Sequence, residues 1–336
     1  MSWAQRRRSR LAAGATALLL AVCGCAGTSS GQQPKRPRST APSTALPSQS
    51  VPLAIGARVN LGTAVNGPGF DGGPDLSPDG LTLHFVSDRP GGEGGGDIWV
   101  THRSSPAAGF GPAENLGSVV NTAGNEGAPS VSADGLSIYL ECFESDPNGR
   151  CHRPDLGDPD IWVATRPDPA HKFNAIRNLG KPVNSPSSDG FSDITSDGRT
   201  LYFSSDWPGG SGGSDLWRAV RSRPTKPFQT VEKLGPEVNA NGYDGGPAIS
   251  SDGLMLFFAS DRPGGFGGND LWVATRTRAT DLFGAPVNVG PQANTPGFED
   301  RPAISSDGST LYFMSDRPGG IGSIDIWQVS ISPRAT

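Results

Sequence analysis

The sequence predicts an all-β protein, a five-bladed β-propeller of four-stranded blades in which the N-terminal strand closes the last blade. The first observation is an Asp-Gly turn that recurs at intervals of 55, 63, 55 and 55 residues, with its aspartate at Asp79, Asp134, Asp197, Asp252 and Asp307. The second is an Asp-(Ile/Leu)-Trp motif that recurs at intervals of 63, 55, 55 and 55 residues, with its tryptophan at Trp99, Trp162, Trp217, Trp272 and Trp327. A fixed period of this length, filled with strands and turns, is typical of radial β-repeat proteins.

The fourth repeat shows how one blade is built. Its first and second strands are joined by Ser251-Asp252-Gly253, a sequence that favours a tight hairpin turn. The second strand is apolar on both faces, as a strand between two packed sheets should be. A Gly-rich loop precedes the third strand, and the fourth strand is more polar and contains Pro286, which a strand near a sheet edge tolerates. We expect these four strands, in order, at residues 246–250, 254–259, 270–276 and 285–290.

One detail favours closure of the ring by the N-terminal strand. The Asn-Leu-Gly segment of a fourth strand occurs at 60–62, before the first Asp-Gly turn, and no such segment follows Trp327. Pairing of the N-terminal strand with the last blade would leave no unpaired seam. We expect the propeller to span residues 51–333.

The repeat also resembles a known family. Ser-x-Asp-Gly, an aromatic strand, Ser-Asp-Arg-Pro-Gly-Gly and Asp-(Ile/Leu)-Trp are similar to the WD40-like (PD40) repeats of TolB-type β-propellers, over about residues 60–330. The Ser-Asp-Arg-Pro-Gly-Gly segment is complete in three repeats, beginning at Ser87, Ser260 and Ser315. The resemblance implies a cell-envelope binding or scaffold propeller without a common catalytic site. TolB has six blades and an additional α/β domain, neither of which is seen here, so a role in the Tol system is not implied.

The N-terminus predicts export. Four arginines within residues 6–10 precede an apolar run of about a dozen residues, which is typical of a secretory signal and too short to span a membrane. A cysteine at the end of this run resembles a bacterial lipobox, so residues 1–25 are interpreted as a lipoprotein-type signal peptide. Cys25 follows a small residue and is the preferred acylation site, with Cys23 as the alternative. Residues 26–50 are rich in Ser, Thr and Pro, which predicts a disordered tether.

The candidate binding residues are acids placed eight positions before each turn aspartate. Inner strands of a propeller line its axis, so these five side chains are expected to form an acidic ring at one mouth of the channel: Asp71, Glu126, Asp189, Asp244 and Glu299. Such a ring would attract Ca²⁺ or a partner bearing Lys or Arg. The alternative is that each acid caps its own turn. Charge is kept where Glu replaces Asp, which favours the electrostatic role.

Departures from the repeat supply the other candidates. Trp207 replaces the arginine of the Ser-Asp-Arg-Pro motif and could contact a sugar or peptide on the rim, or be a neutral substitution. Cys142 and Cys151 lie in a longer second-repeat loop and could form a disulfide in an exported chain. His84 occupies the position of Tyr139, Tyr202, Phe257 and Tyr312 and is interpreted as a packing residue.

A second set of acids directly precedes the tryptophan strands and is expected to accept hydrogen bonds from loop amides, while the tryptophans pack between blades. The set comprises Asp97, Asp160, Asp215, Asp270 and Asp325.

These observations predict a non-catalytic, lipid-anchored envelope propeller that recruits a protein, peptide or glycan at the channel mouth. A net charge of −5 disfavours nucleic-acid binding. The alternative is a glycoside hydrolase, since some five-bladed propellers hydrolyse glycosides with axial carboxylates, here Asp71, Asp189 and Glu299. Near-identical repeats give near-identical environments, which disfavours the separation of pKa values that an acid and a base require.

Overall fold

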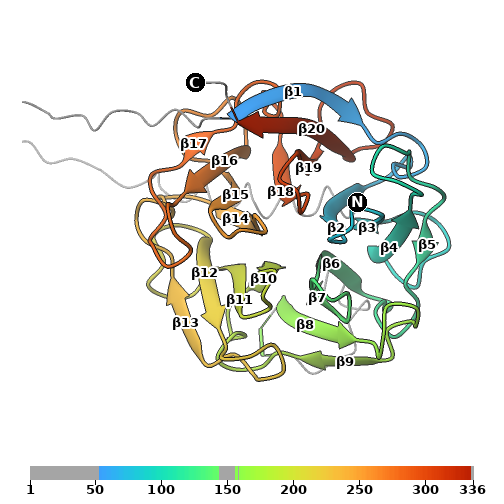
Figure 1. Cartoon of the computed structure of the whole chain (residues 1–336), viewed down its shortest axis with the longest axis horizontal. Coiled ribbons are helices and arrows are strands. Elements are labelled where there is room, and N and C mark those ends of the chain that lie inside the picture. The colour runs from blue at the N-terminus through green and yellow to red at the C-terminus, as the bar shows by residue number, and fades with distance from the viewer. Residues whose placement is uncertain (1–52, 144–155, 158, 334–336) are drawn as a thin grey trace, which may run out of the picture.

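The computed structural model describes residues 53–143, 156–157 and 159–333. These residues form five four-stranded antiparallel sheets arranged as the blades of a ring, with no helix among them (Figure 1). The predicted five-bladed propeller is therefore confirmed. The predicted signal peptide and tether, with Cys23 and Cys25, lie outside the described residues. Within the described ranges, no helix has the length and apolar character that crossing a membrane would need.

Each blade begins with an inner strand at the channel and continues outward through three further strands (Figure 1). The strands are, in blade 1, β2 (Asp71–Leu76), β3 (Thr82–Ser87), β4 (Asp97–His102) and β5 (Glu114–Asn115); in blade 2, β6 (Asn125–Val131), β7 (Ser137–Phe143), β8 (Asp160–Thr165) and β9 (Ala175–Asn178); in blade 3, β10 (Asp189–Ile194), β11 (Thr200–Ser205), β12 (Asp215–Val220) and β13 (Thr230–Lys233); in blade 4, β14 (Asp244–Ile249), β15 (Met255–Ser260), β16 (Asp270–Thr275) and β17 (Val287–Asn288); and in blade 5, β18 (Glu299–Ile304), β19 (Thr310–Ser315), β20 (Asp325–Pro333) and β1 (Leu53–Asn60).

The first strand of the described residues is the outermost strand of the last blade. β1 pairs antiparallel with β20, with Asn60 opposite Trp327, so the ring is closed by joining its two ends. In Figure 1 the blue β1 lies along the red β20. This pairing covers the edge of β20 that would otherwise be unpaired, as the sequence predicts.

The core lies between blades, where the tryptophans pack as predicted. Trp99 clusters with Ile326 of blade 5, and Trp162 clusters with Ile98 of blade 1. The same relation holds for the three other tryptophans, which are all buried. An asparagine on each inter-blade connection also holds the preceding blade: Asn66 accepts from the Ile326 amide at 2.8 Å and donates to its carbonyl at 3.0 Å.

The two faces of the ring differ. The Asp-Gly turns between the first and second strands lie on one face, which we call the turn face. The Gly-rich loops between the second and third strands lie on the opposite face, which we call the loop face. Each inner strand therefore runs from the loop face to the turn face along the channel.

Candidate functional site

The five acids of the predicted ring stand at equivalent positions, at or next to the start of the inner strands on the loop face. Their side chains, however, are buried, with 0–1% exposure in all five cases. They consequently present no charge to the mouth of the channel, and the expectation of an open acidic ring is wrong in this geometric respect. The physical reason is that each carboxylate accepts hydrogen bonds from polar groups of its own repeat, although Oδ1 of Asp189 has no hydrogen-bond partner among the described residues.

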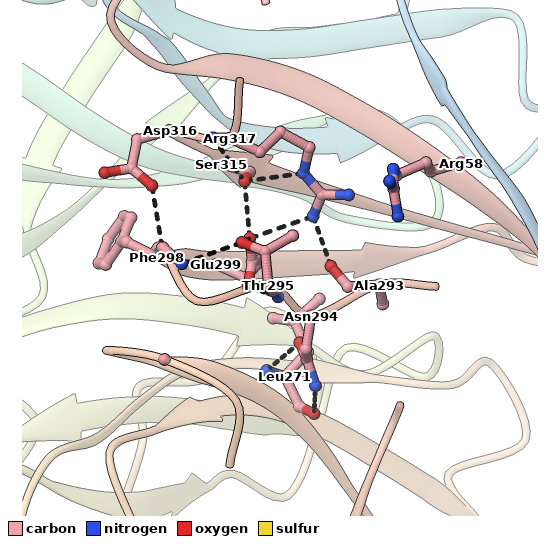
Figure 2. Close-up of polar contacts among 12 residues, drawn as sticks. Arg58, Leu271, Ala293, Asn294, Thr295, Phe298, Glu299, Ser315, Asp316 and Arg317 are labelled. Atoms are coloured by element: carbon pink, nitrogen blue, oxygen red, sulfur yellow. Dashed lines mark hydrogen bonds and ion pairs between the residues drawn. The ribbon is translucent and has the colours of Figure 1, made fainter. Parts of the chain in front are cut away.

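Figure 2 shows the arrangement in blade 5. Glu299 accepts hydrogen bonds from the Thr295 amide at 2.8 Å, the Thr295 hydroxyl at 2.7 Å and the Ser315 hydroxyl at 2.7 Å. It also forms an ion pair with Arg317 at 3.2 Å. The guanidinium lies over the rings of Phe313 and Trp327, at 4.9 and 5.1 Å from their centroids. Burial is the main cause that raises the pKa of Glu299.

The same acid–arginine pair recurs in two other blades. Asp71 pairs with Arg89 at 2.6 Å and Asp244 pairs with Arg262 at 2.5 Å. These arginines also stack on the aromatic residues of their own blades. The acids therefore tie the inner strand to the loop that follows the second strand. Their contacts fit a local structural role, which is the alternative given in the sequence analysis.

Blade 3 departs from this pattern because Trp207 replaces the arginine. Trp207 is partly buried, with its ring 4.8 Å from that of Trp217 and 6.3 Å from that of Phe203. The indole thus fills the place of the stacked guanidinium and is only partly exposed, and its contact with a sugar or peptide stays a prediction. Its Nε1 donates to the Ser185 hydroxyl, which donates in turn to Asp189 at 2.8 Å. Burial raises the pKa of Asp189 to about 6.

The channel is lined instead by the middle and end of the inner strands. A bulge interrupts the pairing of every inner strand with its neighbour. The bulged residue has a positive φ in all five blades, between 47° and 58°, and it is Gly73, Ala128, Phe191, Gly246 or Arg301. Positive φ is uncommon for residues with a Cβ, and bulges often redirect side chains near functional sites. The channel has a volume of about 180 Å³ and reaches the turn residues Pro78, Ala133, Ser196, Ser251 and Ser306.

Arg301 crosses this channel. It forms an ion pair with Glu141 of blade 2 at 2.9 Å, and its guanidinium lies 4.3 Å from the ring centroid of Phe191 in blade 3. Arg301 and Glu141 are 4% and 0% exposed. Gly190 makes room for Glu141, because a Cβ at this position would lie 2.2 Å from Glu141 Oε2. These side chains occupy the channel next to the buried acids and leave it open toward the turn face.

Two further carboxylates line the channel on the turn-face side of Arg301. Asp75 Oδ2 accepts from the Val131 amide at 2.8 Å, and Asp193 accepts from the Ile249 amide at 2.7 Å and the Ser130 hydroxyl at 2.9 Å. Burial raises the pKa of Asp193 to about 6. Burial, followed by the nearby charge of Asp193, raises the pKa of Asp75 well above its usual range.

The sequence analysis did not single out Asp75, Asp193 or Arg301. The detectable signal was a loss of repeat symmetry. Blades 1 and 3 carry Asp where blades 2, 4 and 5 carry Ser130, Ala248 and Ala303.

On the turn face, the mouth of the channel is held by a partial ring of serines. The Ser196 hydroxyl donates to the Ser251 carbonyl at 2.8 Å, the Ser251 hydroxyl donates to the Ser306 carbonyl at 2.6 Å, and the Ser306 hydroxyl donates to the Pro78 carbonyl. Pro78 and Ala133 have no hydroxyl with which to continue the ring around blade 2. The ring of serine hydrogen bonds is therefore interrupted on both sides of blade 2.

The second acid set behaves as predicted. These aspartates accept hydrogen bonds from amides of the preceding Gly-rich loop, such as Leu156 to Asp160 and Ile321 to Asp325, both at 2.6 Å. Cys142 is disulfide-bonded, while its predicted partner Cys151 lies outside the described residues. In the part of the chain that the structure describes, no group of three or more His, Cys, Asp or Glu side chains is arranged to hold a metal ion. The predicted Ca²⁺ site stays a prediction.

Comparisons with known proteins show the fold and go no further. No protein family matches the chain, and no curated protein matches it. Among solved structures, the α-L-arabinofuranosidase of Podospora anserina in complex with cellotriose matches with a TM-score of 0.52 and 14% identity, over 84% of this chain and 98% of that one. TolB from Acinetobacter baumannii matches with a TM-score of 0.49 and 16% identity, over 83% of this chain, which spans 63% of the TolB chain. TolB-like propellers and glycoside hydrolases thus both occur among the structural neighbours.

Proposed function

We propose that this protein is a non-catalytic binding propeller of the bacterial cell envelope that receives a basic side chain of a partner protein or peptide at the turn-face mouth of its channel. The observation that carries the proposal is the position of Asp75 and Asp193. Both carboxylates face a channel that Arg301 crosses on one side and that reaches the surface at the turn residues on the other.

The volume and charge of the channel suit the cationic group of a single basic side chain. A volume of about 180 Å³ is below the usual 300–1,000 Å³ of small-molecule pockets, so a single inserted side chain fits better than a whole ligand. Burial disfavours the charged forms of Asp75 and Asp193. An ammonium or guanidinium group between them would supply the opposite charge and stabilise both carboxylates.

The test is binding of Nα-acetyl-lysine and Nα-acetyl-arginine methylamides, measured by NMR titration, followed by capture of partners from envelope extract. We expect the parent propeller to bind one of these probes and the Asp75→Asn/Asp193→Asn variant to lose both the probe and the captured partner. Asp197→Asn, which removes an exposed turn carboxylate, is the matched control and should retain both. Equal capture by the parent and the double variant would refute a role for the channel.

Membrane attachment is the second part of the proposal and concerns the N-terminal residues. We expect Cys25 to carry an acyl chain, which the apolar run and the small residue before this cysteine support. Metabolic labelling with palmitate should mark the parent and Cys23→Ser but not Cys25→Ser. Label lost only in Cys23→Ser would assign the acylation to the alternative cysteine.

A second candidate is glycoside hydrolysis, favoured by two channel carboxylates with unequally raised pKa values. In this hypothesis the catalytic carboxylates are Asp75 and Asp193. The three acids expected from the sequence, Asp71, Asp189 and Glu299, are enclosed within their blades. Turnover of aryl arabinofuranosides or arabinan that is lost in Asp193→Asn and kept in Asp197→Asn would establish an enzyme and overturn the non-catalytic proposal.

A further inference from the structure

Neighbouring blades are joined near the turn face by a repeated tyrosine–arginine hydrogen bond. The tyrosine lies on the second strand of one blade, and the arginine directly follows the third strand of the next blade around the ring, so that blade 1 follows blade 5. Arginine Nη2 donates to the tyrosine hydroxyl in three pairs: Arg221 to Tyr139 at 2.8 Å, Arg276 to Tyr202 at 3.2 Å and Arg103 to Tyr312 at 3.4 Å. These bonds link blade 2 to 3, blade 3 to 4 and blade 5 to 1.

At the interface of blades 4 and 5, both members of the pair are apolar. Phe257 stands in the tyrosine position and Ile331 stands in the arginine position, and both are buried in one hydrophobic cluster. Both the hydrogen-bond donor and the acceptor are replaced by apolar side chains, so neither member of the pair is left buried without a partner. Replacing both partners of a hydrogen bond by apolar groups costs little stability.

At the interface of blades 1 and 2, only the tyrosine is replaced. Arg166 keeps the setting of its counterparts: its Nε donates to the Gly135 carbonyl at 2.7 Å, and its guanidinium lies 4.7 Å from the centroid of Phe173. His84 stands in the tyrosine position and is too short to supply the acceptor. Among the described residues, none accepts a hydrogen bond from Arg166 Nη2.

His84 itself is also without a partner. It is 3% exposed, and neither ring nitrogen is hydrogen-bonded to a described residue, with Nδ1 fully enclosed. Burial lowers the pKa of His84 to about 3, so the ring is neutral at pH 7 and carries one N–H donor. A buried polar group without a partner is costly and is rare in native proteins.

These two groups line a cavity of about 520 Å³ between blades 1 and 2. This volume lies within the range of pockets that hold small molecules. Val100, Leu116 and Phe173 form apolar parts of its wall. The cavity shares Pro78 and Ala133 with the channel mouth, so it lies beside the gap in the serine ring.

The cavity is lined by groups of both charges. The basic ones are Arg166 and, exposed at the rim, Lys172 and His171, whose ring contacts the carboxylate of Asp168 at 2.8 Å. Two of the acids that line it, Asp79 and Asp134, each accept hydrogen bonds from a serine hydroxyl and an amide of their own turn. The third, Glu114, is exposed. Arg166 therefore supplies the positive charge that no described carboxylate neutralises by direct contact.

We propose that this cavity binds a small organic carboxylate, with its oxygens on Arg166 Nη2 and the His84 N–H and its body against Phe173 and Leu116. The carboxylate oxygen takes the place of the tyrosine hydroxyl in the other interfaces. One arginine and one neutral imidazole match the single charge and planar oxygens of a carboxylate. The site is separate from the channel carboxylates and does not depend on the function proposed for them.

Calorimetric titration of the purified propeller with two acids of different origin tests this site. Glucuronate represents sugar acids and N-acetylphenylalanine represents peptide C-termini. Glucose and N-acetylphenylalaninamide are their uncharged counterparts, and inorganic phosphate is a further arm. We expect at least one acid to bind at least tenfold more tightly than its uncharged counterpart and than phosphate, and the acid that does so identifies the source of the carboxylate.

Variants that restore or remove the repeat pattern then locate the binding. His84→Tyr should occupy the carboxylate position beside Arg166, form the missing bond with Arg166, raise the melting temperature and weaken acid binding at least tenfold. Arg166→Met should weaken binding equally. Arg276→Met breaks the intact link to Tyr202 and is the matched control: it should lower the melting temperature and leave acid binding unchanged.

The proposal is overturned if neither acid binds at about 10 mM, a concentration at which even weak sites fill. Tighter binding of phosphate than of either acid also overturns it. So does acid binding that persists in both His84→Tyr and Arg166→Met.

Discussion

Arg301 of blade 5 and Glu141 of blade 2 form an ion pair at 2.9 Å across the channel of the propeller. Their blades are not neighbours in the ring (Figure 1). The pair therefore links two blades that do not pack against each other, and it occupies the axis with the ring of Phe191 alongside. Because both side chains are buried, the pair fixes the inside of the channel and separates the buried acids on the loop face from Asp75 and Asp193.

Removal of one member of this pair should be strongly destabilising. Arg301→Met leaves the Glu141 carboxylate buried without its cation, and we expect a loss of about 3–5 kcal/mol in the free energy of unfolding. Urea denaturation at pH 7 measures it. Arg301→Met/Glu141→Gln should recover most of the loss, because the stranded charge is removed as well. A single variant as stable as the parent would show that the pair contributes no net stability.

Asp193 should make the protein less stable as pH rises through about 4–6. Its pKa is raised from about 3.8 in the unfolded chain to about 6 in the fold, so the folded state binds more protons in this interval. Asp193→Asn removes this dependence, and we expect it to gain on the order of 2 kcal/mol over the parent at pH 8 and nothing below pH ~4. The measurement is the difference between the two unfolding free energies as a function of pH. A difference that is flat from pH 4 to 8 would contradict the raised pKa.

Two of the buried acids should respond differently to the same substitution. Asp244 has an ion pair with Arg262, whereas Asp189 forms no ion pair among the described residues. Each accepts one backbone hydrogen bond, at 2.6 and 2.7 Å. Asp244→Asn should cost about 3 kcal/mol because it strands a guanidinium, and Asp189→Asn about 1 kcal/mol or less. Chemical denaturation of both variants measures the difference, and equal losses would show that Arg262 contributes little.

Restoring the repeat pattern at Trp207 should stabilise blade 3. Trp207→Arg would place a guanidinium beside Asp189 and over Phe203, as Arg262 lies beside Asp244 and over Phe258. The arginine lowers the raised pKa of Asp189, so the gain should be present above pH ~6 and vanish as pH falls below ~4. Melting temperatures of the variant and parent at pH 8 and pH 4 test this. In an Asp189→Asn background the substitution should give no gain.

The sequence was sufficient for the blades because each is a local unit with its own turn and loop chemistry. The expected strands at 246–250, 254–259, 270–276 and 285–290 correspond to β14, β15, β16 and β17, with differences confined to their ends. Closure by β1 was also predictable, since the Asn-Leu-Gly segment before the first turn has no counterpart after Trp327. Equal spacing predicted which residues are equivalent, such as the five buried acids and the five tryptophans.

What the repeat could not give is the direction of each side chain. Asp71 and its equivalents stand at the predicted level of the channel, but their carboxylates are enclosed by groups of the same blade, which only the packed structure reveals. Asp75, Asp193 and Arg301 look like isolated departures along the chain, and Arg301 and Glu141 are 160 residues apart. The sequence alone determined the architecture, because hydrogen bonds and turns within a blade are local. The tertiary structure decided which charges meet, because the ring brings distant residues together around one desolvated axis.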